Sequence, residues 1–306
     1  MKKISFQLIA ILLAAAMLLA GASVLFLQPA LKNDIDNDAP LEDESNPPSD
    51  TPATDEDEPE NSVPELPEEP ENPEESEEPE EPEEVLPPAP EPPATANYVK
   101  AKVNGLNLRS GPSSGYASVG YIDAGDMVTL LAKEGSWYKT NYKNKIAYIS
   151  ANETYTEIHS MEQSEESAIE QVINEGLLLL GHRYVYGAIR FHDGAGNKLK
   201  NFDPTKYDCS SLMQYIFFHG AGINLNMTTR TQVKQGTFVS KNDLKRGDLM
   251  FFTNSSRYHY TGIERIGHVA LYLGDNYILH TASDYAVIEQ ISTTRWKYYI
   301  ESRRFF

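Results

Sequence analysis

A long segment rich in proline and acidic residues limits where this chain can fold. Residues 28–96 contain 17 of the 19 prolines and 25 of the 45 acidic residues, but a single lysine. So few apolar side chains cannot offset the conformational entropy that ordering costs, and the prolines and like charges favour an extended spacer. We therefore predict a disordered linker over residues 28–96 and a folded part after it.

The formal net charge of −19 belongs almost entirely to this linker. Residues 97–306 carry 23 basic and 20 acidic residues, so the predicted folded part is close to neutral. Its basic residues do not cluster with interleaved aromatics, which argues against nucleic-acid binding. The sequence has neither an HExxH motif nor paired cysteine and histidine spacing, so we predict no metal site and no cofactor.

The first 27 residues combine a positive start with a long apolar run. Lys2 and Lys3 precede the run from Ile4 to Leu27. Ala20-Gly21-Ala22 fits the cleavage site of a signal peptide, but a run of this length could also span a bilayer as an uncleaved membrane anchor. Both alternatives place the rest of the chain outside the cytoplasm, at the cell wall or the outer face of the cytoplasmic membrane.

Short strands separated by turn residues are expected over residues 97–157. Residues 98–103 alternate between apolar and polar, and further strands are expected at residues 119–122, 127–131, 137–140 and 146–149. Several short strands at this spacing indicate a small β-barrel. The segment LNLRSGPS at residues 106–113 resembles bacterial SH3-like domains. That resemblance implies a module that binds the cell wall; a purely structural barrel is the alternative.

A helical pattern replaces the alternation from Ser160 onward. Ser160 and Gln163 have the spacing of a capping box, so we predict a helix from Ser160 to a stop at Gly181. A second helix is expected over residues 210–219, and strands over residues 248–252, 268–273, 277–281 and 286–291. Helices followed by antiparallel strands indicate an α+β domain over residues 160–306. The apolar face of the first helix is predicted to contain Ile169, Val172, Ile173, Leu177 and Leu180.

The only cysteine of the chain, Cys209, lies at the predicted start of the second helix, directly after Asp208. The positive end of a helix dipole favours a thiolate, and a nearby protonated histidine would favour it further. This position indicates a nucleophile. The alternative is an aspartate cap beside a buried, unreactive cysteine.

Two histidines fall on consecutive predicted strands. Val269, Leu271 and Leu273 share one strand face, so His268 lies on the other. An odd-numbered loop would place His280 opposite Ala270 and on the same face as His268, whereas an even loop would separate them. We predict that His268 is the base or imidazolium partner of Cys209, and that His280 orients His268. Backbone N–H groups at the helix start, including that of Cys209, would hold an oxyanion.

Six motifs in sequence order resemble the NlpC/p60 family of cell-wall cysteine peptidases: GHRYVYG at residues 181–187, DCSSL at 208–212, TRTQ at 229–232, LKRGDLMFF at 244–252, GHVALYLG at 267–274, and LH at 279–280. The resemblance implies a papain-like α+β fold and a catalytic triad of Cys209, His268 and His280. It also implies hydrolysis of peptidoglycan stem peptides through a thioester, usually between γ-D-glutamate and the diamino acid.

Family members that require a free N-terminal L-alanine bind its amine with a tyrosine and with the aspartate and serine beside the nucleophile. The matching residues are Tyr186, Asp208 and Ser210, which the resemblance therefore implies as substrate-binding residues. Residues 189–206 and 254–266 are longer than the family usually shows. Two other functions stay open: an amidase or acyl/peptidyl transferase of the same fold, and a non-catalytic wall-binding scaffold.

Overall fold

The structure is a computed structural model that describes residues 92–281 and 284–306. The predicted signal peptide or anchor over residues 1–27, and the predicted linker up to residue 91, lie outside the described residues. Among the residues that are described, no helix is long and apolar enough to cross a membrane.

The first eight strands occupy residues 95–162. They are β1 (Thr95–Ala101), β2 (Leu106–Arg109), β3 (Ser118–Ile122), β4 (Met127–Thr129), β5 (Ala132–Glu134), β6 (Trp137–Tyr142), β7 (Lys145–Ser150) and β8 (Thr156–Glu162). Five of them form a sheet in the order β3-β2-β7-β6-β5, while β1, β4 and β8 belong to a second, larger sheet. The strands predicted at residues 119–122, 127–131, 137–140 and 146–149 are all present, with small differences at their ends.

The helix predicted from Ser160 begins later than expected. Ser160 lies in β8, which pairs antiparallel with β1 along its whole length. The first helix is α2 (Ser167–Leu178). The capping-box prediction was wrong because pairing with β1 satisfies far more backbone N–H and C=O groups than one side-chain cap could. The predicted apolar face is correct, since Ile169, Val172, Ile173 and Leu177 are buried. The boundary predicted between residues 157 and 160 falls inside β8.

A nine-stranded antiparallel sheet has the order β11-β16-β12-β13-β14-β15-β4-β1-β8. Its remaining strands are β11 (Thr237–Val239), β12 (Leu249–Phe252), β13 (His268–Gly274), β14 (Tyr277–Thr281), β15 (Ala286–Gln290) and β16 (Tyr299–Arg304). A short parallel pair, β9 (Arg183–Tyr184) and β10 (Lys206–Tyr207), lies outside this sheet. The combination of helices and antiparallel strands confirms the predicted α+β class.

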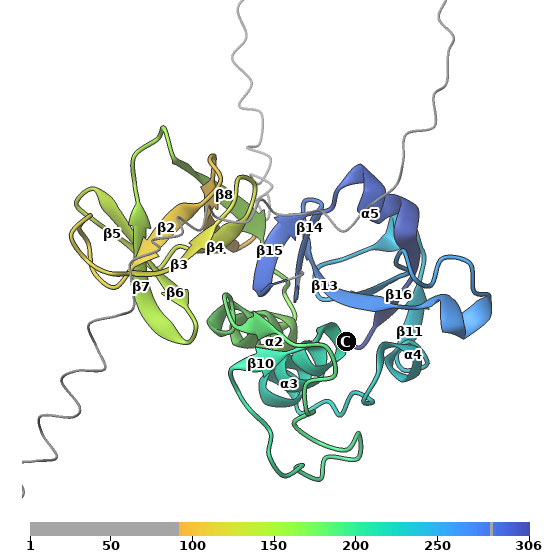
Figure 1. The fold of residues 1–306 in the computed structure, drawn as a ribbon. Coiled ribbons are helices and arrows are strands. Elements are labelled where there is room, and N and C mark those ends of the chain that lie inside the picture. The colour runs from red at the N-terminus through yellow and green to blue at the C-terminus, as the bar shows by residue number, and fades with distance from the viewer. Residues whose placement is uncertain (1–91, 282–283) are drawn as a thin grey trace, which may run out of the picture. The chain divides into compact units, whose positions relative to one another are not determined.

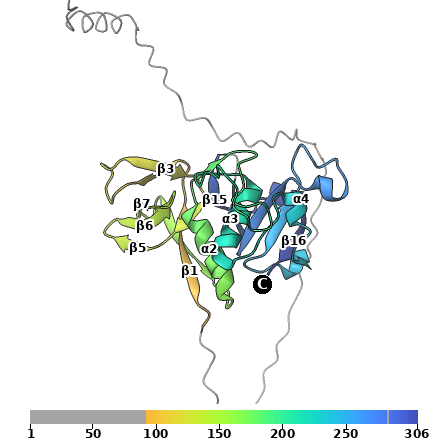
Figure 2. The same cartoon turned by 90° about the horizontal axis from the view of Figure 1, so that it is seen from below.

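Helices cover both faces of the sheet. Figure 1 and Figure 2 show α2 and α3 (Cys209–Ala221) together on one side of β13–β15, and Figure 1 shows α5 (Thr293–Tyr298) away from them. Alternate strand residues accordingly pack in two cores. Val269 and Leu279 belong to the core that includes the buried residues of α3, whereas Ala270 and Ile278 pack with Trp296 of α5. Along the chain, α4 (Thr229–Gln232) comes after α3 and before α5.

Buried polar contacts reinforce the attachment of β1 to the rest of the sheet. Arg246 donates to Glu170 of α2 at 2.6 Å, to the backbone carbonyl of Leu273 in β13 at 2.7 Å, and to the hydroxyl of Tyr98 in β1 at 3.1 Å. These bonds satisfy a guanidinium that is almost fully buried, which is the condition under which a buried charge is tolerated. Arg246 therefore links α2, β13 and β1 through hydrogen bonds of its side chain.

Candidate active site

Cys209 is the first residue of α3, and Asp208 caps this helix. The Asp208 carboxylate accepts the backbone N–H of Ser211 at 2.8 Å, while the Ser211 hydroxyl accepts the backbone N–H of Asp208 at 2.8 Å. This reciprocal cap fixes the direction of the first turn. The thiol is 8% exposed, and the backbone N–H of Val269 lies within hydrogen-bonding reach of it. The structure therefore brings Cys209 beside the start of β13, where His268 lies.

The Cys209 thiol is protonated at neutral pH. Burial, reinforced by the negative charge of Asp208, raises its pKa to about 12, although N–H groups of Val269 and Ser210 and the charge of Arg190 act in the opposite direction. The N–H of Ser210 at the helix N-terminus favours the thiolate as expected, but burial outweighs it. Desolvation outweighs the helix dipole because the thiolate would lose its water without gaining a full counter-charge.

The hairpin between β13 and β14 places both histidines on one face, but by a different route from the predicted one. Its turn has two residues, Asp275 and Asn276, both with positive φ, so the prediction of an odd loop was wrong. A β-bulge between Tyr272 and Gly274 adds one residue to β13. This extra residue restores the register in which Leu271 opposes Leu279, so that His280 continues opposite Ala270 as expected.

The two imidazoles are hydrogen-bonded to each other, and Glu289 lies at ion-pair distance from the second one. Nε2 of His268 lies 2.9 Å from Nδ1 of His280, and Nε2 of His280 lies 3.0 Å from Oε1 of Glu289 in β15. A proton on Nε2 of His280, facing the Glu289 carboxylate, is the tautomer that lets Nδ1 accept from Nε2–H of His268. The remaining nitrogen of His268, Nδ1, is left with a lone pair that can take a proton.

The imidazole of His268 is neutral at physiological pH. Burial lowers its pKa well below the ordinary value, and the neighbouring His280 and Arg295 lower it further, whereas Glu289 acts in the opposite direction. Of the two roles that the sequence left open for His268, base and imidazolium partner, the electrostatics favour the base. A neutral imidazole beside a protonated thiol is the resting state that follows from these two pKa shifts.

Sequence reasoning missed Glu289 and Arg295. Arg295 of α5 lies 2.7 Å from the same Glu289 oxygen that faces His280. A weak signal was present, because Glu289 follows directly on the apolar run Ala286-Val287-Ile288 within one strand. Glu289 reaches His280 because β15 lies next to β14, with Glu289 paired to Ile278. The sequence of one strand alone does not predict which strand pairs with it.

Two of the predicted substrate-binding residues, Asp208 and Ser210, have side-chain oxygens that this chain already engages. Asp208 and Ser210 are buried, and both contact Arg190, whose Nη2 lies 2.8 Å from Oδ2 of Asp208 and 2.8 Å from Oγ of Ser210. The side chain of Tyr186 is 87% exposed. Arg190 lies in the long segment at residues 189–206, and nothing in the sequence indicated that it would reach the nucleophile.

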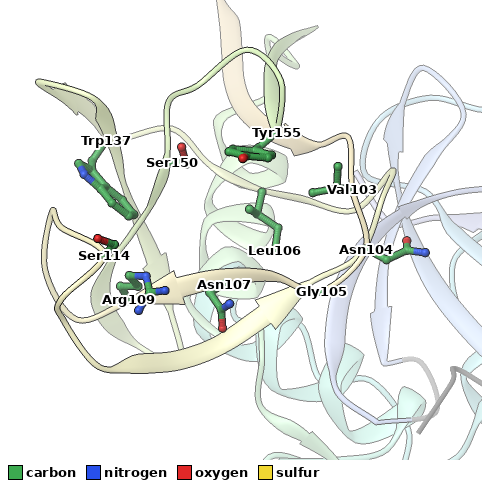
Figure 3. A pocket seen from close by; sticks show the side chains of 10 residues that line it. All are labelled: Val103, Asn104, Gly105, Leu106, Asn107, Arg109, Ser114, Trp137, Ser150 and Tyr155. Carbon is green, nitrogen blue, oxygen red and sulfur yellow. The ribbon is translucent and has the colours of Figure 1, made fainter. Parts of the chain in front are cut away.

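A second candidate site is a hollow of about 320 Å³ among residues 103–155. Figure 3 shows Trp137 and Arg109 at one side of it and Tyr155 and Leu106 at the other. Aromatic faces and an arginine are suited to a peptide or sugar with apolar and polar groups. This hollow belongs to the segment that resembled SH3-like domains.

Comparison with known proteins identifies the family of the chain. The NlpC/P60 family profile matches residues 181–304, and the profile of bacterial SH3 domains matches residues 104–154. The murein DD-endopeptidase MepS/murein LD-carboxypeptidase of Escherichia coli K12 is 30% identical over 164 residues, which cover 51% of this chain and 83% of that protein. The chain belongs to the NlpC/P60 family. Its α+β part from residue 181 onward is the NlpC/P60 domain.

Other relatives share only part of their length with this NlpC/P60 protein. Peptidoglycan DL-endopeptidase CwlO of Bacillus licheniformis is 31% identical over 141 residues, which cover 45% of this chain and 28% of CwlO. The crystal structure of an NlpC/P60 family protein from Bacillus cereus is 22% identical, covers 68% of this chain and 63% of its own, and has a TM-score of 0.35. The chain thus spans less than a third of CwlO.

Proposed function

We propose that this protein is a peptidoglycan hydrolase that cleaves stem peptides with Cys209 as nucleophile, His268 as base and His280 as orienting residue. The observation that carries the proposal is the hydrogen bond between His280 and His268, which begins the strand beside Cys209, with Glu289 at ion-pair distance from His280. The relatives named above are endopeptidases of peptidoglycan or murein. The bond that we assign is the one between γ-D-glutamate and the diamino acid.

The first half of the reaction forms a thioester. Nδ1 of His268 removes the Cys209 proton as Sγ attacks the γ-carbonyl carbon of D-glutamate, and the backbone N–H of Cys209 stabilises the oxyanion. When the tetrahedral intermediate collapses, the amide C–N bond breaks and the imidazolium of His268 gives its proton to the leaving amine. The acyl group remains on sulfur.

The second half restores the thiol. His268 removes a proton from water as the water oxygen attacks the thioester carbonyl carbon. The C–S bond then breaks, and the sulfur takes back the proton, so that a free γ-carboxyl group is released. Because both Cys209 and His268 are neutral at rest, proton transfer accompanies nucleophilic attack rather than preceding it.

We further propose that the hollow lined by Trp137 and Tyr155 holds the cell wall, and that the N-terminal segment exports the chain or anchors it to the membrane. Stacking of a sugar or peptide plane on the exposed aromatic faces supports this role. Co-sedimentation of the Trp137→Ala protein with purified wall tests it, because retained binding at the wild-type level would remove the hollow from the proposal.

The central experiment is digestion of purified peptidoglycan by the protein and by its Cys209→Ala variant, followed by mass spectrometry. New fragments cut between γ-D-glutamate and the diamino acid, absent with the variant, are the expected result. Joined fragments would assign transferase activity, and fragments cut elsewhere would assign an amidase. Bound but uncut wall would identify a non-catalytic scaffold.

A further inference from the structure

The carboxylate beside the nucleophile already has all its hydrogen-bonding positions taken. Oδ1 of Asp208 accepts from the backbone N–H of Ser211 at 2.8 Å and from Oγ of Ser210 at 3.1 Å. Oδ2 accepts from Gly187 at 3.2 Å and faces Arg190 at 2.8 Å. A carboxylate has about four lone-pair positions, and here three hydrogen bonds and one ion pair from this chain engage them.

Arg190 is held in place by more than its ion pair. Nε donates to the backbone carbonyl of Met227 at 2.8 Å, Nη1 donates to the carbonyl of Ala188, and Nη2 contacts both Ser210 and Asp208. Three N–H bonds of the guanidinium donate to these acceptors and Nη2 also faces Asp208, which leaves one N–H of Nη1 for a further acceptor. The Arg190 side chain is 14% exposed, so most of it is fixed inside the protein.

This arrangement is unsuited to a free ammonium group. An ammonium has three donors and no acceptor, so it needs a carboxylate or carbonyl that is not already satisfied. Here it would meet the charge of Arg190, with Asp208 occupied and the Ser210 hydroxyl engaged with both. An acylated nitrogen is neutral, and its carbonyl oxygen can accept the remaining Nη1–H of Arg190.

We propose that Arg190 is a specificity-determining residue that makes this protein select stem peptides whose N-terminal L-alanine nitrogen is acylated, as it is in intact wall. Released peptides with a free amine are the disfavoured class. The inference rests on the proposed function, because it names the substrate form for the same site. It assigns to Asp208 and Ser210 the task of holding Arg190 rather than that of binding an amine directly.

The test compares two synthetic peptides, L-alanyl-γ-D-glutamyl-diamino acid with a free N-terminus and the same peptide N-acetylated. The diamino acid is the one that wall digestion releases. The full chain should show a higher kcat/KM for the acetylated peptide by about 10-fold or more, the size expected for one unfavourable polar contact. The ratio is taken within one protein, so a partly destabilised variant still reports on selectivity.

Three variants complete the test. Arg190→Ala frees the Asp208 carboxylate, so the ratio should fall towards one or reverse in favour of the free amine. Arg190→Lys keeps a cation against Asp208 and should retain the preference for the acetylated peptide. Lys200→Ala removes an exposed cation from the same long segment and should leave the ratio unchanged.

Two outcomes overturn the proposal: a wild-type preference for the free amine, and an Arg190→Ala ratio equal to that of the wild type. If Arg190→Ala does not fold, the wild-type ratio and Arg190→Lys still decide. Cleavage of neither peptide, together with uncut wall, is a different result, because it removes the proposed function rather than the selectivity.

Discussion

Two arginine–carboxylate pairs flank the candidate active site, and the same residue types are used differently in each. Asp208 and Arg190 lie 2.8 Å apart beside Cys209, while Glu289 and Arg295 lie 2.7 Å apart beyond His280. The Asp208 oxygens are all engaged by donors near the helix start. Glu289 instead directs an oxygen to the His280 ring at 3.0 Å. The first pair therefore organises structure, and the second reaches His280, the predicted orienting residue.

Each pair also affects the pKa of a neighbouring side chain, and its carboxylate and its arginine act in opposite directions. Asp208 raises and Arg190 lowers the pKa of Cys209. Glu289 raises and Arg295 lowers the pKa of His268. Burial is the largest cause of both pKa shifts, and both side chains stay neutral at pH 7. A residue's charge alone is thus a poor guide to its role; the partners that its remaining atoms find are decisive.

The largest expected effect concerns the ionisation of Cys209. With a pKa raised to about 12, the thiolate fraction at pH 7 is very small and grows about tenfold with each pH unit. We expect the rate of alkylation of Cys209 by iodoacetamide to rise by about 1,000-fold from pH 7 to pH 10 without a plateau. Mass spectrometry of quenched samples measures this rate.

The control is the Cys209→Ala protein, which has no cysteine and should not be alkylated. A plateau between pH 6 and pH 8 would show a preformed thiolate, and the neutral resting state argued from burial would be wrong. The same pKa shift contributes to the free energy of unfolding. This contribution is fully present below pH 9 and is lost as the pH rises towards 12, because the folded state binds the thiol proton more tightly than the unfolded chain.

The Asp208 side of the comparison should respond mainly in stability. Asp208→Asn replaces two acceptors by one acceptor and one donor, and it leaves Arg190 without its counter-charge. We expect the free energy of unfolding to fall by about 3 kcal/mol, the lower part of the range for breaking a buried pair, since Arg190 retains some exposure. The urea-denaturation midpoint measures this change.

Asp203→Asn is the matched control, because Asp203 forms an exposed ion pair with Lys206 in the same long segment. Its denaturation midpoint should stay near that of the wild type. A small effect of Asp208→Asn on stability, equal to that of Asp203→Asn, would mean that the four contacts of Asp208 do not organise the start of α3.

The Glu289 side should respond mainly in catalysis. In Glu289→Gln, the amide can donate as well as accept, so His280 is no longer held to one tautomer and the imidazolium formed during attack loses a nearby negative charge. We expect kcat to fall about 10-fold to 100-fold, less than for a residue that touches the base directly, with KM nearly unchanged. Steady-state kinetics on the acetylated peptide separate the two parameters.

Glu301→Gln provides the comparison for that variant, because Glu301 pairs with Arg303 on β16, outside the group of His268, His280 and Glu289. Its kcat should match the wild-type value. If Glu289→Gln also retained wild-type kcat, the functional set of contacts would end at His280.

The smallest expected effect concerns Arg295. Its charge is one of the causes that lower the pKa of His268, so Arg295→Gln should raise that pKa. The acid limb of the kcat/KM profile, set by protonation of His268, should then move to higher pH, while activity above pH 7 changes little. Arg303→Gln is the control, and an acid limb that stays in place in Arg295→Gln would show that burial alone sets the pKa of His268.

Local pattern predicted much of the fold. Alternation of apolar residues predicted β13 and β14, and periodicity predicted the buried face of α2, because both depend on repeats within one segment. Ser160 failed for the opposite reason. Its capping spacing is local, but β1, about 60 residues earlier, provides a partner strand that residues 156–162 pair with instead. The spacing of residues within one segment carries no information about such a distant partner strand.

The sequence determined the residue types and order at the site: Cys209 after a helix-capping aspartate, His268 at the start of a strand, and His280 on the strand that returns. Only the tertiary structure decided how they are connected. The bulge in β13 sets the shared face, the pairing of β14 with β15 delivers Glu289, and the path of residues 189–206 delivers Arg190. These contacts join residues that are distant along the chain, so their geometry depends on packing, which no single segment encodes.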